Sequence, residues 1–179
     1  MAAPPDPLAW QLVGKRPGST GWITVTTSTY RMPDGSQADW DLVEGPDIVA
    51  VLALTADGEV VLVRQFRPGP DAVLAELPGG IIDAGETPLD AGQRELLEET
   101  GYAGEAAVIG WLWRSASELR RQWVVVVTGA RRVAEPDPGA LEFLQVTTAS
   151  LEDLRAHLRS GQLTDTAAGY RALDHLGRL

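Results

Sequence analysis

The pattern of apolar and polar residues divides the chain into short strands and three helices. A continuous apolar run at residues 48–54 predicts a buried strand, and residues 59–67 predict its hairpin partner after an Ala-Asp-Gly turn. Residues 122–128 contain four consecutive valines and predict a central strand. The other segments with strand composition, rich in β-branched and apolar residues, are residues 21–31, 38–43, 106–113 and 141–147.

Helix start and stop residues place the first helix at residues 88–100. Thr87 is the expected N-cap, Pro88 occupies the first helical position, and Asp90 forms a capping-box arrangement three residues after the cap. Gly101 supplies the left-handed residue that commonly ends a helix. Two later helices are predicted, at residues 151–158 and from residue 164 or 165 to about residue 176.

This mixture of elements predicts an α+β fold in which a mixed sheet lies between helices. At 179 residues, the chain is long enough for one domain with a sizeable core. The strands at 21–31 and 38–43, joined by a Pro-Asp-Gly turn, form an antiparallel hairpin ahead of that core. We therefore expect an N-terminal strand region at residues 1–45 and a main domain at residues 46–179.

On a helical projection, the first helix has a sheet-facing side and a separate acidic side. Glu95, Glu98 and Glu99 are close neighbours there, and Arg94 is placed to neutralise one of them, Glu98. The side predicted to pack on the sheet consists of Leu89, Gly92, Gln93, Leu96 and Thr100, flanked by Leu97.

Such an acidic cluster is most often a solvated helix face. This one follows a glycine-rich loop, and carboxylates beside free backbone groups suit a hard divalent cation such as Mg²⁺ together with phosphate oxygens.

Composition narrows the possible partners. The net charge of −10 argues against a nucleic-acid surface. No apolar run approaches the length of a membrane span, and the first residues lack the pattern of a signal peptide. Cysteine is absent, which excludes disulfides and agrees with a cytoplasmic protein. An acidic protein that handles a phosphate substrate needs local Arg and a cation to offset the repulsion.

The stretch from Gly80 to Tyr102 resembles the Nudix box, the signature of the Nudix hydrolase superfamily. Tyr102 departs mildly from it, since an aliphatic residue is commoner there. The residues that match at the correct spacing are Gly80, Glu86, Arg94, Glu95, Leu96, Glu98, Glu99 and Gly101.

The resemblance covers residues 49–176 and implies the Nudix-type α/β/α sandwich. The N-terminal hairpin is similar to that of the ADP-ribose pyrophosphatase branch, where it serves dimer formation, so a homodimer through these strands is implied. A hairpin folded onto its own domain is the alternative.

The resemblance also implies the roles of individual residues. Mg²⁺, with Mn²⁺ as a substitute, would be held by Glu95, Glu99, Glu98 and the carbonyl of Gly79. Glu98 is alternatively a partner of metal-bound water, and Arg94 orients the glutamates. The residues expected to serve the substrate are Arg64, Arg67, Glu76 and Gly80, with Glu76 in the outer metal shell. Glu86 adds a ligand or fixes the loop.

The resemblance to the ADP-ribose branch also implies a general base on a late loop, where Glu135, Asp137 and Glu142 are candidates and Glu135 is favoured. The implied reaction is metal-dependent hydrolysis of a nucleoside diphosphate linked to another moiety, with ADP-ribose as the first expectation. The ADP-ribose enzymes commonly carry a proline after the box. That proline is absent here, and Glu118 stands near its place. The alternatives are a nucleotide sugar, an oxidised nucleoside triphosphate, and a Nudix-fold protein that binds a ligand without catalysis.

Overall fold

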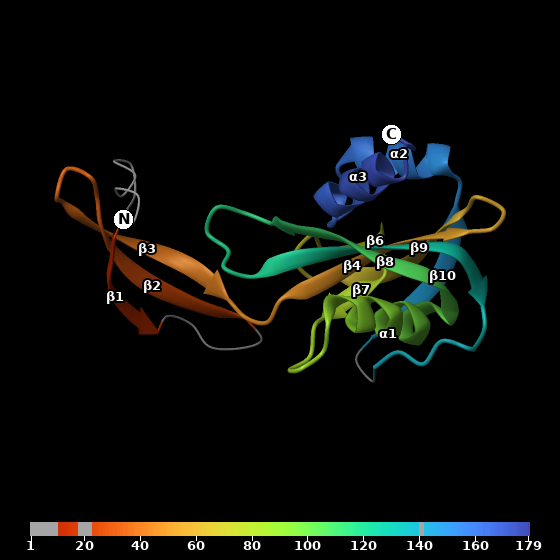
Figure 1. The fold of residues 1–179 in the computed structure, drawn as a ribbon, viewed down its shortest axis with the longest axis horizontal. Coiled ribbons are helices and arrows are strands. Elements are labelled where there is room, and N and C mark those ends of the chain that lie inside the picture. Colours follow the sequence, from red (N-terminus) through yellow and green to blue (C-terminus); the bar gives the residue numbers. More distant parts are fainter. Residues whose placement is uncertain (1–10, 18–22, 140–141) are drawn as a thin grey trace, which may run out of the picture. The chain divides into compact units, whose positions relative to one another are not determined.

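The structure is a computed structural model of the chain, and it describes residues 11–17, 23–139 and 142–179. The chain forms two compact units (Figure 1). The first consists of residues 1–45 together with residues 113–120, and the second of residues 46–112 and 121–179. The start of the predicted strand at 21–31 and residue 141 lie outside the described residues.

The first unit is a three-stranded antiparallel sheet in the order β1-β2-β3, where the sequence predicted a hairpin. Its strands are β1 (Gln11–Pro17), β2 (Thr24–Arg31) and β3 (Gln37–Glu44). The additional strand, β1, carries glycine, lysine and arginine, a composition that gives little strand signal. Residues 113–120 contact β3, because Val43 exchanges backbone hydrogen bonds with Ser117 and Leu119 at 2.8 and 2.9 Å.

The second unit contains a mixed sheet in the order β10-β5-β4-β9-β8, with β6 paired to β5 and β7 to β4. The parallel pair β4–β9 lies at its centre, as the run of four valines predicted. The strands are β4 (Ile48–Thr55), β5 (Val60–Arg67), β6 (Ala72–Glu76), β7 (Gly79–Ile81), β8 (Tyr102–Trp113), β9 (Arg121–Arg132) and β10 (Leu144–Ala149).

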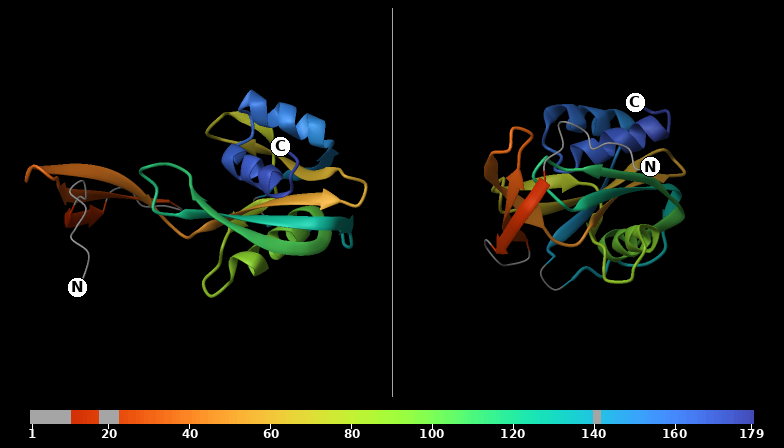
Figure 2. Two further views of the ribbon diagram at one scale, coloured as in Figure 1. Left: turned by 45° about the horizontal axis from the view of Figure 1, so that its top comes forward. Right: turned by 60° about the vertical axis from the view of Figure 1, so that its left-hand side comes forward.

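Helices cover both faces of this sheet (Figure 2). Successive residues of each strand point to opposite faces of the sheet, so they contribute to two hydrophobic cores, one on each face. Leu52, Leu62 and Val126 pack with the C-terminal helices α2 (Leu151–Ser160) and α3 (Thr166–His175). On the other face, Val51, Val61 and Val125 pack with the helix α1 (Pro88–Thr100). The predicted α/β/α sandwich is thus confirmed, and none of the described helices is long and apolar enough to cross a membrane.

Helix α1 begins and ends where the sequence predicted. The Thr87 hydroxyl oxygen accepts a hydrogen bond from the Asp90 amide, and Gly101 has a left-handed φ of 72°. Gly92 lies so close to the sheet that a Cβ there would lie 2.8 Å from a methyl group of Val125.

The predicted packing side of α1 was partly wrong. Gln93 and Leu97 are exposed. The buried positions are Ala91, Gly92, Glu95, Leu96, Glu99 and Thr100. The helix therefore turns two of its three clustered glutamates, Glu95 and Glu99, toward the protein interior rather than toward solvent.

Two short strands, β6 and β7, have little signal in the sequence. β7 begins at the glycine pair Gly79-Gly80, which composition alone assigns to a loop. A Cβ at Gly79 would overlap the carbonyl oxygen of Val49, so a glycine allows this strand to pair closely with β4.

A candidate active site at the acidic helix

Arg94 is the centre of the acidic cluster, and it binds more groups than the single glutamate that the sequence predicted. Its guanidinium takes both oxygens of Glu86 in a fork at 2.9 and 3.0 Å. One terminal nitrogen also donates to Glu95 at 2.9 Å and to Glu98 at 3.0 Å, and the other donates to the carbonyl of Ile81. The hydrogen bonds with Glu86 lower the pKa of Glu86 and raise that of Arg94.

Glu99 is the most deeply buried acid of the predicted metal-binding group. Its side-chain oxygen accepts a hydrogen bond from the Gly79 amide at 2.9 Å. Burial raises the pKa of Glu99 to about 8, and the nearby charges of Glu95 and Glu142 act in the same direction. The Gly79 amide and the charge of Arg67 oppose this rise. In the absence of a cation, Glu99 is therefore mostly protonated at neutral pH.

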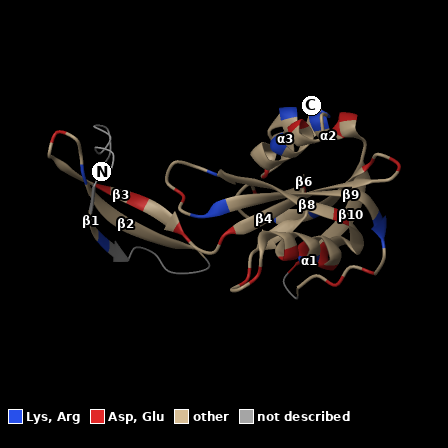
Figure 3. Ribbon diagram, viewed as in Figure 1, with Lys and Arg blue, Asp and Glu red and all other residues tan. Residues whose placement is uncertain are grey.

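Glu95 lies against the glycine pair. A Cβ at Gly80 would overlap the Glu95 carboxylate, so glycine leaves the space in which that carboxylate sits. Burial raises the pKa of Glu95, although Arg94 opposes the change. Glu98 is different, because its side chain is 46% exposed. Figure 3 shows the acidic residues of α1 gathered on this helix.

The Glu95 and Glu99 pair fits a hard divalent cation. Two buried carboxylates whose ionised forms are disfavoured would both be stabilised by a positive charge between them. Among the residues that the structure describes, no three acidic, histidine or cysteine side chains form a group that could hold a metal ion unaided. Glu98 shares the Arg94 guanidinium with Glu95 instead of completing such a group.

The two arginines that the sequence predicted for substrate binding lie differently. Arg67 donates from Nε to Glu76 at 2.6 Å, and its charge acts on Glu99. Arg64 instead donates to Gln145 at 3.1 Å. The two arginines are three residues apart on one strand, so alternation places them on opposite faces of the sheet. The structure therefore brings Arg67, and not Arg64, to the acidic helix.

Glu76 is fully buried, and both of its oxygens are engaged. One oxygen accepts the hydrogen bond from Arg67, and the other accepts one from the hydroxyl of Thr164. Direct contact of Glu76 with a substrate or its metal remains a prediction from the sequence. In the structure, its carboxylate is a support for Arg67.

The three acids of the late loop differ in what they contact. Glu135 is 87% exposed on its side chain and pairs with Arg132 at 2.6 Å. The backbone amide of Asp137 binds the carbonyl of Glu98 at 2.8 Å. Glu142 is the late-loop acid whose charge contributes to the raised pKa values of both Glu95 and Glu99. The structure thus associates Glu142 with the buried pair and Glu135 with Arg132.

Asp47 is a supporting residue that the sequence analysis missed. Its carboxylate accepts hydrogen bonds from the Arg121 backbone and side chain and from the Trp123 indole at 2.8–3.0 Å. Its carbonyl accepts the Ile82 amide at 3.0 Å, next to the Ile81 carbonyl that binds Arg94. Burial would raise the pKa of Asp47, but the Trp123 and Arg121 hydrogen bonds outweigh it and lower that pKa. A lone aspartate before a strand gives no signal of such a role.

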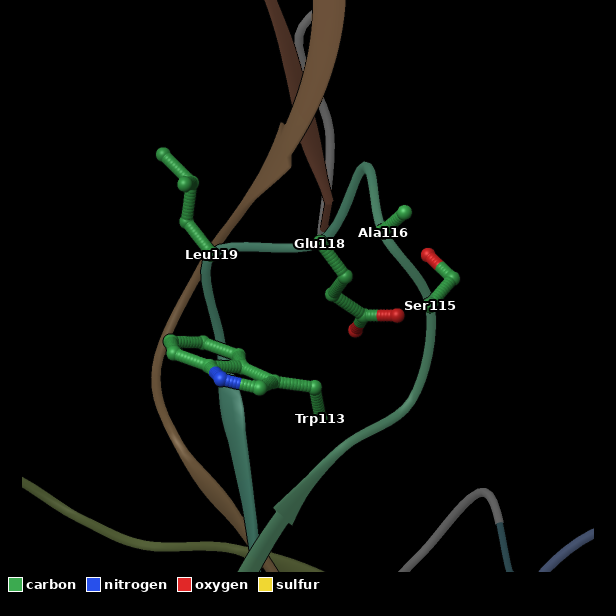
Figure 4. A pocket seen from close by; sticks show the side chains of 5 residues that line it. All are labelled: Trp113, Ser115, Ala116, Glu118 and Leu119. Atoms are coloured by element: carbon green, nitrogen blue, oxygen red, sulfur yellow. The ribbon is translucent and has the colours of Figure 1, made fainter. Parts of the chain in front are cut away.

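The segment where a proline was expected forms a pocket of about 470 Å³ within the first unit (Figure 4). The indole of Trp113 lies on one side of it, and the carboxylate of Glu118 lies near it. Glu118 pairs with Arg120, whose Nε is buried without a hydrogen-bond partner. The residues that line the pocket are Trp113, Ser115, Ala116, Glu118 and Leu119.

Comparison with known proteins identifies the family. A model described as the NUDIX domain matches residues 45–167. This match spans more than half of the chain, so the protein belongs to the Nudix hydrolase family, as the resemblance implied.

Two curated relatives are similar over most of the chain. The ADP-ribose pyrophosphatase of Bacillus subtilis (strain 168) is 32% identical over 155 residues, which cover 83% of this chain and 82% of that protein. The ADP-sugar pyrophosphatase of Mus musculus is 34% identical over 155 residues, covering 76% and 71%. A solved structure described as an ADP compounds hydrolase has a TM-score of 0.72 at 20% identity and covers 96% of this chain and 95% of its own, which shows the shared fold.

The raised pKa of Glu99 predicts a stability that depends on pH. Between its ordinary value of 4.5 and its folded value of about 8, the folded chain holds a proton that the unfolded chain has released. Stability is therefore highest below this window and falls as the pH rises through it, with a slope from Glu99 approaching about 1.4 kcal/mol per pH unit. Urea unfolding in EDTA at several pH values measures it.

Two substitutions test whether Glu99 causes this pH dependence of stability. Glu99→Gln removes the titrating group but keeps an oxygen for the Gly79 amide, so we expect a flatter pH dependence. Glu98→Gln changes an exposed glutamate of the same helix and should leave the slope unaltered. Saturating Mg²⁺ should oppose the loss at high pH, because a cation binds the ionised form. An equal slope in Glu99→Gln and the unsubstituted protein would contradict the assignment.

Proposed function

We propose that this protein hydrolyses the pyrophosphate bond of ADP-ribose and releases AMP and ribose 5-phosphate. The observation that supports this most directly is the buried pair Glu95 and Glu99, which Arg94 and the glycine pair hold beside Arg67. The names of the two curated relatives support the choice of an ADP-linked substrate.

The proposed cofactor is Mg²⁺, with Mn²⁺ as a substitute. Glu95 and Glu99 would hold it, with the Gly79 carbonyl and with Glu98 either as a ligand or as a partner of bound water. When bound, such a cation neutralises phosphate charge and lowers the pKa of water. Nudix hydrolases in general depend on divalent metal ions, which supports a cation at this site.

The residues of the chain would then act as follows. Arg94 fixes Glu95 relative to Glu86, and the Gly79 amide fixes one oxygen of Glu99. The terminal nitrogens of Arg67 bind a diphosphate oxygen, a geometry that guanidinium groups favour. The oxygen of a water molecule attacks one phosphorus, a general base takes its proton, and the bond from that phosphorus to the bridging oxygen breaks.

We propose Glu142 as this base, in place of the Glu135 that the sequence favoured. Glu142 is the late-loop acid whose charge is felt by Glu95 and Glu99, whereas Glu135 pairs with Arg132. A base must lie within reach of the attacked bond, and the charge of Glu142 acts on both of the glutamates proposed to hold the cation.

A nucleotide sugar is the second candidate substrate. The mouse relative is named an ADP-sugar pyrophosphatase, and Glu118 stands near the place of the expected proline. A nucleoside triphosphate would give pyrophosphate and a monophosphate instead. A ligand-binding protein without catalysis is disfavoured, because every glutamate of the box is present.

A hydrolysis screen with Mg²⁺ and with Mn²⁺ tests the proposed reaction. We expect AMP and ribose 5-phosphate from ADP-ribose, and weaker turnover of nucleotide sugars and nucleoside triphosphates. Glu99→Gln should reduce turnover at least about a hundredfold, because it removes a ligand charge that the reaction needs. Ligand binding without any product, in the unsubstituted protein, would instead support the binding-protein alternative.

A matched pair of substitutions tests the base. Glu142→Gln should lower kcat about a hundredfold at neutral pH, the usual size of a general-base contribution. Glu135→Gln removes an acid from the same loop and should keep kcat within about twofold of the original, since an exposed ion pair contributes little. The opposite order of effects in steady-state kinetics would return the role to Glu135.

We also propose a homodimer through the N-terminal strands. Among the described residues of the first unit, Leu42 is the one buried apolar side chain, whereas Val13, Ile23 and Trp40 are 39–46% exposed. A small sheet with so little buried apolar surface is marginal alone, and a second copy would cover it. Localisation in the cytoplasm stays a prediction from the cysteine-free composition.

Sedimentation at micromolar concentration tests the dimer. We expect twice the chain mass, and Trp40→Glu should shift the protein toward monomer by placing a charge on the covered surface. Val108→Glu introduces the same charge at a position of similar exposure, 38%, in the second unit and should leave the mass unchanged. A monomer in the unsubstituted protein would refute the proposal.

A further inference from the structure

The turn between α2 and α3 contacts the group that supports Arg67. The Thr164 hydroxyl in this turn donates a hydrogen bond to one oxygen of Glu76. The other oxygen of Glu76 accepts the bond from Arg67 Nε at 2.6 Å. Glu76 has no exposed surface, so these two contacts determine how its carboxylate is oriented.

The turn itself is anchored on both sides of Thr164. The preceding residue, Leu163, is 2% exposed and belongs to the core formed with α2 and α3. The following residue, Asp165, accepts a hydrogen bond from the side chain of Gln122 at 2.6 Å. The Thr164 hydroxyl is therefore held by the fold, and it can act as a fixed donor to Glu76.

Glu76 accepts its hydrogen bond from Nε of Arg67, the inner nitrogen of the guanidinium. The side chain of Arg67 is 41% exposed, and its charge favours the ionised form of Glu99. Binding through Nε leaves the two terminal nitrogens of Arg67 for a ligand, and it fixes the plane of the guanidinium. Bidentate recognition of a phosphate depends on that plane.

We propose that Thr164 is a positioning residue for the substrate diphosphate, acting through Glu76 on Arg67. The C-terminal turn then determines the orientation of the arginine, although it contacts no reacting atom itself. The inference rests on the proposed function, since it assigns the diphosphate to Arg67. It adds a residue far from the Nudix box in the sequence to the machinery of the site.

Thr164→Val tests this role, because it removes the hydroxyl and keeps the shape of the side chain. We expect KM for ADP-ribose to rise about tenfold, the lower end for a hydrogen bond to a charged group, with kcat within about twofold. Thr164→Ser restores the hydroxyl and should restore KM. Thr166→Val is the matched control, because the Thr166 hydroxyl binds the carbonyl of Leu163 and not Glu76.

A double substitution shows whether Thr164 acts through Arg67. Arg67→Lys keeps a charge for Glu76 but loses the planar guanidinium, and should itself raise KM. In that background, Thr164→Val should raise KM by less than about twofold, because the two residues act on one interaction. Full additivity of the two effects would overturn the proposal.

A measurement without substrate separates this proposal from the proposed function. Hydrogen exchange of the Arg67 Nε–H, followed by ¹⁵N NMR and assigned by its loss in Arg67→Lys, should be slow in the unsubstituted protein and in Thr166→Val. It should be at least about tenfold faster in Thr164→Val. Equal exchange in Thr164→Val and Thr166→Val overturns the positioning role, whereas failure to hydrolyse ADP-ribose with the expected exchange overturns only the proposed function.

Discussion

The interaction on which the site depends is the set of hydrogen bonds from Arg94. Four acids lie on or beside one helix face, and their mutual repulsion would favour opening of the helix and its loop. Arg94 binds Glu86, Glu95 and Glu98 and also the carbonyl of Ile81. Its guanidinium therefore connects the glycine-rich strand, the following loop and the helix. Glu99 lies outside this set, and its charge is instead suppressed by burial.

The rest of the fold supports this cluster from three directions. Asp47 holds the Ile82 backbone, next to the carbonyl that Arg94 uses. Gly92 allows α1 to approach Val125, and this close packing brings Glu95 and Glu99 to the interior. On the other side, Glu76 and Thr164 connect Arg67 to the C-terminal helices. The site is therefore assembled from distant parts of the sequence around one short signature.

Much of this arrangement could be predicted from the sequence, because its signals are local. Capping residues gave both ends of α1, and the spacing of the box residues gave the family. The failures concern properties that local spacing does not contain. The helical projection placed Gln93 and Leu97 on or beside the packing side of α1, whereas the structure exposes both and buries Glu95 and Glu99. Strand alternation places Arg64 and Arg67 on opposite faces, but it does not say which of the two faces α1 until the packing of the sheet is known. Asp47 and Thr164 act through residues 35 or more positions away, and no pattern links them.

If Glu99 holds the proposed cation, burial of Glu99 makes binding of that cation an exchange with a proton. Burial favours a proton on this carboxyl at neutral pH, so the proposed cation would bind only as that proton leaves. With Glu99 as a ligand of the proposed cation, protons and cations would compete for the same oxygens, and acidification would lower the fraction of protein that carries the cation. The described histidines, His157 and His175, lie on the outer helices α2 and α3. A glutamate can thus give this protein a response to physiological pH that is usually attributed to histidine.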